Sequence, residues 1–114
     1  MDKQQRRELR AQYDQRKPDM GVVCWRSHDQ MWIATSEDAA ADYNGTLFQL
    51  KLGSWPNREM QKAYTQDPDS FQWSLLKRLD YKEREDDHAD DLELLFLMCQ
   101  EEYPQAQRMR PGRR

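Results

Sequence analysis

The sequence predicts an α+β fold in which a small three-stranded antiparallel sheet is flanked by helices. Segments 21–26 and 31–36 are rich in β-branched and aromatic residues, which favour strands, and the polar link between them can close a hairpin. Segment 71–79 begins with alternating apolar and polar side chains, which is the period of a third strand. Apolar residues recur at helical spacing over 90–102, so this segment is expected to pack on the sheet as the main core helix.

The chain between the second and third strands predicts two helices. Ser36 is a suitable N-cap for the first helix, and Gly53 is a suitable residue to end it. An Asn-Gly pair interrupts this stretch, so the sequence leaves open one bent helix or two pieces. Asn57 predicts the cap of the second helix, over 58–64. The expected order is therefore strand, strand, helix, helix, strand, helix.

Charge divides the 114 residues into three parts. Residues 1–17 hold six Lys/Arg against three Asp/Glu and predict a short, basic N-terminal helical segment. Residues 105–114 predict a basic C-terminal tail, and the domain is expected to span 18–104. Because basic segments bind phosphate, the two ends supply the candidate nucleic-acid contacts, whereas the acidic body between them repels a nucleic acid. These candidate contacts are Arg6, Arg7, Arg108 and Arg110.

Composition predicts a cytoplasmic protein with no membrane contact. No apolar run approaches the ~20 residues that span a bilayer, and the basic N-terminus has no apolar segment behind it. Cys24 and Cys99 lie in apolar contexts far apart in sequence, which predicts buried free thiols. No metal-ligand spacing is present, so no metal site is expected. Trp55, in a turn, is predicted to be exposed and is a candidate partner contact together with Arg58.

In their order and spacing, several segments resemble the GIY-YIG nuclease family, and in particular its small bacterial single-domain members. The resemblance covers residues 5–104, and it implies the element order given above with an extra N-terminal helix. The matching phrases are Met20-Gly21-Val22-Val23 for the GIY strand, Trp32-Ile33-Ala34-Thr35-Ser36 for the YIG strand, 47–54 and 57–62 for the helical region, 71–76 for the third strand and 91–95 for the last helix.

The resemblance also implies which positions would carry the chemistry. Enzymes of this family use two strand tyrosines to position and activate water, a helix arginine to stabilise the phosphate, and a glutamate on the last helix to hold a divalent metal. At the tyrosine positions this sequence has Val23 and Trp32, and at the arginine position it has Leu47. The glutamate position aligns with Phe96, although a shift of one turn offers Glu93. Valine, leucine and phenylalanine have no proton to transfer and no charge to contribute.

These substitutions predict a GIY-YIG-like domain without catalytic residues, acting as a binding or regulatory module in a bacterial cytoplasm. A protein partner of unknown identity is expected rather than nucleic acid, and no cofactor is expected. One alternative is an active, Mg²⁺-dependent endonuclease with a rebuilt site. Its candidate side chains would be Tyr43, Tyr64 or Tyr81 with Arg26 or Arg58. Another alternative is nucleic-acid binding without cleavage, through the basic ends.

Overall fold

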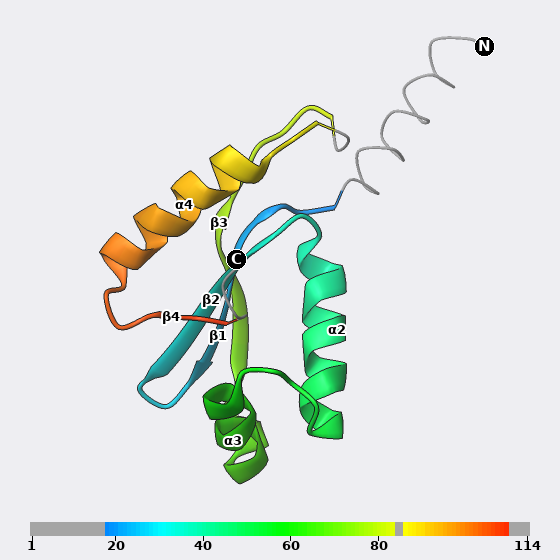
Figure 1. The fold of residues 1–114 in the computed structure, drawn as a ribbon, viewed down its shortest axis with the longest axis vertical. Helices are drawn as coiled ribbons and strands as arrows, with labels where there is room; N and C mark the ends of the chain where they lie inside the picture. Colours follow the sequence, from blue (N-terminus) through cyan, green and yellow to red (C-terminus); the bar gives the residue numbers. More distant parts are fainter. Residues whose placement is uncertain (1–17, 84–85, 110–114) are drawn as a thin grey trace, which may run out of the picture.

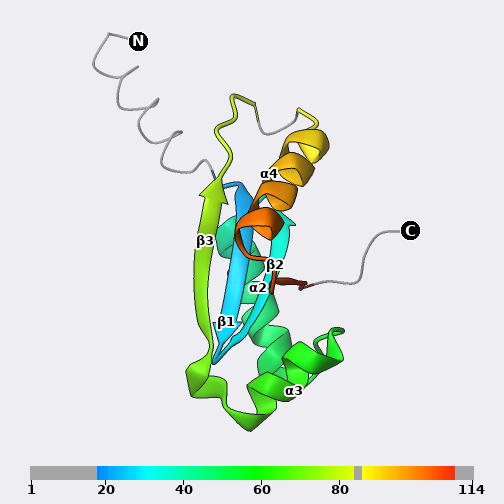
Figure 2. The same ribbon diagram turned by 90° about the vertical axis from the view of Figure 1, so that its left-hand side faces the viewer.

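A four-stranded sheet lies between two layers of helices in the computed structural model, which describes residues 18–83 and 86–109 (Figure 1). Helices α2 and α3 cover one face of the sheet, and α4 covers the other (Figures 1 and 2). The α+β class and the predicted order of elements are confirmed. The elements are β1 (Gly21–Ser27), β2 (Gln30–Ser36), α2 (Ala39–Leu52), α3 (Arg58–Gln66), the short 3₁₀ helix η1 (Pro68–Ser70), β3 (Gln72–Arg78), α4 (Ala89–Glu102) and β4 (Gln107–Arg108).

The strand order is β3-β1-β2-β4, and the first three strands are antiparallel, as predicted. The prediction of only three strands is wrong, because β4 pairs in parallel with β2. A hydrogen bond from the Met109 N–H to the Ile33 carbonyl extends this pairing. Two residues are too few to show a strand period, so the sequence pattern of the expected tail gave no sign of β4.

The hairpin turn is tighter than the sequence predicted. The pairing of β1 with β2 continues to Ser27 and Gln30, which leaves His28 and Asp29 as a two-residue turn, shorter than the polar link that the sequence predicted. His28 adopts a φ of 54°, the left-handed conformation that such turns require. The sequence did not predict this pairing because the residues at the two strand ends are polar. The hydrogen bonds of the ladder join backbone groups, so polar residues can take part in it as well.

Helix α2 is one continuous helix of 14 residues, which settles the question that the Asn-Gly pair raised. Its N-cap is Asp38 rather than Ser36: the Asp38 carboxylate accepts from the Ala41 N–H at 3.1 Å. Ser36 lies just outside, where its hydroxyl accepts from the Asp38 N–H. Gly53 ends the helix with a φ of 77°, as predicted. No described helix is long and apolar enough to cross a membrane.

Helix α3 begins as the sequence predicted. The Asn57 side chain caps it by accepting from the Met60 N–H at 3.1 Å. The same amide donates to the carbonyl oxygen of Arg108 at 3.1 Å, which ties the start of α3 to β4. The predicted N-terminal helix lies outside the described residues.

Alternation along the strands sends side chains into two separate cores. The α2-side core consists of Val23, Trp25, Trp32, Ala34, Ala39, Leu50, Trp55, Met60 and Met109. The α4-side core consists of Val22, Cys24, Met31, Ile33, Phe96, Cys99 and Ala106. Ala106 and Met109 fall in the segment expected to be a tail, yet both are buried in a core. Folded structure therefore continues beyond residue 104, the expected end of the domain.

Cys24 and Cys99 are free and buried, as predicted. Burial raises the pKa of the Cys24 thiol above its ordinary value of 9.0, although nearby Arg26 acts in the opposite direction. Burial also raises the pKa of Cys99. In both cases the neutral thiol is favoured in the folded state.

We expect a disulfide reagent at neutral pH to label the native protein roughly tenfold or more slowly than the urea-unfolded protein, because the reactive thiolate is scarce and shielded. Since the folded thiols have the higher pKa, their contribution to stability is present below pH 9.0 and is lost as the pH rises through and above that value. Absorbance of the thiol released from the reagent measures the labelling rate. Equal rates for native and unfolded protein would contradict the buried positions of both thiols.

Candidate functional site

Three of the four positions that the sequence resemblance assigns to the family's catalytic residues lie on the α2 side of the sheet. Val23 is in β1, where it pairs with Ala34 and Leu75 on the neighbouring strands. Trp32 is in β2 and is fully buried, and Leu47 on α2 is half-buried against the same core. All three are apolar residues that pack in or against the α2-side core, so packed side chains fill this face of the sheet.

An aromatic cluster occupies this face of the sheet. The Trp25 ring stacks on Tyr43 with centroids 5.5 Å apart, and the Trp32 ring stacks on Phe71 at 5.8 Å. The pairing register places Trp73, Trp25 and Trp32 side by side on three adjacent strands. Each ring pair of this kind contributes about 0.5–1.5 kcal/mol beyond the area that it buries. The members of the aromatic cluster are Trp25, Trp32, Tyr43, Tyr64, Phe71 and Trp73.

Two tyrosines that a rebuilt nuclease site would draw upon are members of this aromatic cluster. Tyr43 stacks on Trp25 and meets Trp73 edge-on at 5.2 Å, and Tyr64 meets Phe71 edge-on at 5.2 Å. Tyr81 lies apart, where its hydroxyl donates to the Pro18 carbonyl at 2.5 Å. The sequence showed the aromatic residues but not that they converge, because cross-strand register decides which rings meet.

Phe96 occupies a different place from the other three positions. It is buried in the α4-side core, on the opposite face of the sheet from Val23 and Trp32. The guanidinium carbon of Arg108 lies 4.3 Å from the centroid of the Phe96 ring. Glu93, the alternative offered by a one-turn shift, is exposed and forms an ion pair with Arg108 at 3.6 Å. The structure therefore brings three of the four aligned positions together and separates the fourth.

The side chains proposed for partner or nucleic-acid contact are scattered. Trp55 was predicted to be exposed, but it is only 9% exposed and packs in the α2-side core. The backbone N–H of Trp55 donates to the Gln61 side-chain oxygen at 3.0 Å, which ties the turn to α3. Arg58 is exposed at the start of α3, and Arg108 covers Phe96 on the other side of the sheet. The remaining candidates Arg6, Arg7 and Arg110 lie outside the described residues.

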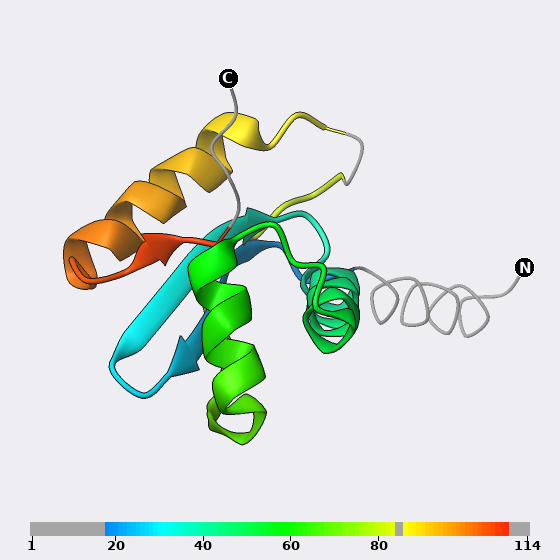
Figure 3. The ribbon, with the colours of Figure 1, turned by 60° about the horizontal axis from the view of Figure 1, so that its bottom comes forward.

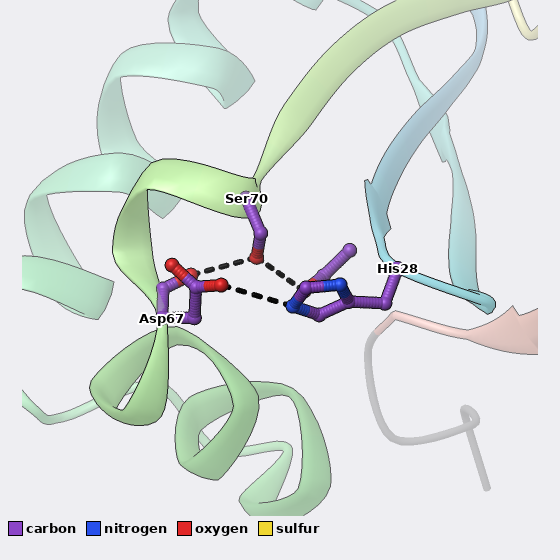
Figure 4. Close-up of polar contacts among 4 residues, drawn as sticks. His28, Asp67 and Ser70 are labelled. Carbon is purple, nitrogen blue, oxygen red and sulfur yellow. Dashed lines mark hydrogen bonds and ion pairs between the residues drawn. The ribbon is translucent and has the colours of Figure 1, made fainter.

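A small polar cluster near the hairpin turn contains the residue types of a nucleophilic triad (Figure 4). His28 Nε2 lies 2.9 Å from Asp67 Oδ2. The Ser70 hydroxyl donates to the Asp67 carbonyl at 2.7 Å, so the Ser27 hydroxyl, 2.6 Å away, is the donor toward Ser70. Within the described chain, neither serine is hydrogen-bonded to His28, whereas a triad needs its histidine to accept from the nucleophile. The cluster ties the β1–β2 turn to the segment that leads into β3.

In the part of the chain that the structure describes, no three His, Cys, Asp or Glu side chains converge to hold a metal ion.

Together these elements form a GIY-YIG-like nuclease fold. The catalytic domain of the homing endonuclease I-TevI matches with a TM-score of 0.64 and 11% identity, covering 81% of this chain and 99% of that one. A variant of the catalytic domain of the intron endonuclease I-TevI, with a glutamate replaced by alanine, matches with a TM-score of 0.66 and 11% identity, covering 83% of this chain and 97% of that one. No family model and no curated protein sequence matches the chain. At this identity the likeness shows the fold.

Proposed function

We propose that this protein is a non-catalytic GIY-YIG-like domain that acts as a binding or regulatory module in a bacterial cytoplasm. The observation that carries the proposal is the aromatic cluster. It fills the face of the sheet that carries Val23, Trp32 and Leu47, the residues at the positions that the resemblance assigns to the family's tyrosines and arginine. Phosphodiester cleavage needs an activated nucleophile and a cation at the transferring group, and apolar side chains supply neither.

The cations of the described sheet favour a protein partner over a nucleic acid. Lys77 forms an ion pair with Glu102 at 3.0 Å, and Arg78 lies 3.7 Å from an Asp19 oxygen. The Arg26 guanidinium carbon lies 5.4 Å from the centroid of the Tyr103 ring. A phosphate would have to compete with these contacts, and with the acidic charge of the body, for each cation.

We expect the purified protein to leave supercoiled plasmid DNA and single-stranded RNA intact in the presence of Mg²⁺ or Mn²⁺. Loss of one charge-stabilising donor lowers a rate by ~10²–10³-fold, and groups that act as a unit do not contribute additively. Gel electrophoresis over a long incubation, with EDTA as the metal-free reference, measures cleavage.

The control for a contaminating nuclease is to purify Arg26→Ala and Arg58→Ala variants in parallel. These are the two cations that a rebuilt site would use, and both are exposed, so the variants should stay folded. A contaminant would cleave equally in all three preparations. Metal-dependent cleavage by the wild type that disappears in either folded variant would overturn the proposal and establish a rebuilt active site.

A further inference from the structure

Helix α4 presents apolar side chains on both of its sides. Its inner side buries Leu92, Phe96 and Cys99 against the sheet. Its outer side carries Leu94, Leu97 and Met98, which are 59%, 50% and 42% exposed and which we call the outer ridge. Residues three and four apart lie next to one another on a helix, so these three side chains form one continuous surface. The helix is an outer layer of the molecule (Figure 3).

Acidic side chains border the outer ridge at both ends. Asp90 and Asp91 lie in the first turn of α4, and Glu101 and Glu102 lie in the last turn. The helix has no Lys or Arg. Glu102 is paired with Lys77, whereas Asp90, Asp91 and Glu101 form no ion pair with another described residue. An apolar centre inside a polar rim is the usual composition of a protein-binding surface.

We infer that the outer ridge docks a basic amphipathic helix of a partner protein. Leucine and methionine side chains would pack against the apolar stripe of that helix, and its lysines or arginines would meet the acids at the two ends of the ridge. The acidic charge of α4 favours a basic helix over the other possible partners. A second copy of α4 would bring Asp90, Asp91 and Glu101 against the same three acids, and a nucleic acid or an anionic membrane would be repelled. The inference rests on the proposed binding role and names the chemistry of its partner.

Another exposed apolar pair provides a matched comparison. Phe48 and Leu52, four residues apart on α2, are 64% and 65% exposed. Helix α2 contains one acid, Asp42, and one base, Lys51, so this pair has no acidic border. If apolar exposure alone attracted a basic helix, both surfaces would bind it equally.

The test uses the full chain and two labelled synthetic helical peptides. Both have leucine at heptad positions a and d, and they carry either lysine or glutamate at positions e and g. We expect the lysine peptide to bind about tenfold or more tightly than the glutamate peptide by fluorescence anisotropy. The triple variant Leu94→Gln/Leu97→Gln/Met98→Gln should raise the Kd of the lysine peptide by about tenfold or more. Charge reversal by Asp90→Lys/Asp91→Lys/Glu101→Lys should also weaken binding and reduce its dependence on salt.

The matched variant Phe48→Gln/Leu52→Gln should leave the Kd within about twofold, because interface truncations matter only where the partner sits. Equal binding of the two peptides, or a ridge variant with unchanged affinity and unchanged thermal stability, would overturn the inference. So would self-association of the wild type that the ridge variant abolishes, since the occupant would then be a second copy. The nuclease assay is read separately, so cleavage would refute the proposed lack of activity without changing the peptide result.

Discussion

Phe96→Glu should destabilise the protein by roughly 3–5 kcal/mol, a large share of the stability of a domain of this size. The substitution removes a fully packed ring from the α4-side core and places a carboxylate in its position. Arg108 lies over the ring, but its side chain is half exposed, so it would only partly compensate the new charge. Urea denaturation followed by tryptophan fluorescence measures the loss.

Two companion variants separate the causes of this effect. Phe96→Gln has nearly the same shape as Phe96→Glu without the charge, so the difference between them reports the cost of burying the carboxylate. Leu97→Glu introduces the same charge one residue along, on the outer side of α4, and should change stability by no more than about 0.5 kcal/mol. A change below about 1 kcal/mol for Phe96→Glu would show that Phe96 does not have the buried position described above.

Gly21→Ala should destabilise the fold by about 2–4 kcal/mol, because β1 and β3 approach too closely there for any side chain. A Cβ atom at Gly21 would lie 1.9 Å from the backbone oxygen of Lys77 and 3.0 Å from the Cα of Arg78. The obstacle is backbone, so the strands themselves would have to separate. Thermal and chemical denaturation measure the effect.

Gly45→Ala provides the opposite case in the same chain. Gly45 lies in the exposed middle of α2, and a Cβ there meets nothing within 4 Å. Alanine favours the helix over glycine, so this variant should stabilise the protein by about 0.5–1 kcal/mol. If both alanine variants behaved alike, the close approach of β1 and β3 would be contradicted.

The strands and the core helix could be predicted because their signals are local. β-Branched and aromatic residues marked β1 and β2, alternating apolar residues marked β3, and helical spacing marked α4. Gly53 marked a helix end because it has no side chain and tolerates a positive φ, and Asn57 marked a helix start because its side chain can cap one. The order of these elements along the chain is also the order that the GIY-YIG resemblance implies, and the structural likeness confirms that fold.

The remaining features depend on contacts between distant residues. Trp55 lies in a turn between polar neighbours, so its sequence context does not indicate burial. Its burial depends on the packing of this turn onto the α2-side core. The resemblance assigned Phe96 to the same site as Val23 and Trp32, but helix rotation and the path of the chain place it on the opposite face of the sheet. The aromatic cluster depends in the same way on the register of three strands.

The pairing of β4 with β2 has a consequence for the rate of folding. Trp32 and Ile33 pair with Gln107 and Arg108, so this contact joins the second strand of the described chain to its last strand. Closing so long a loop costs conformational entropy, although the cost grows only slowly with loop length. Chains with many long-range contacts fold more slowly than chains dominated by local ones. The hairpin of β1 and β2 forms between neighbouring residues, whereas β4 can pair with β2 only after the long intervening chain has brought the two strands together.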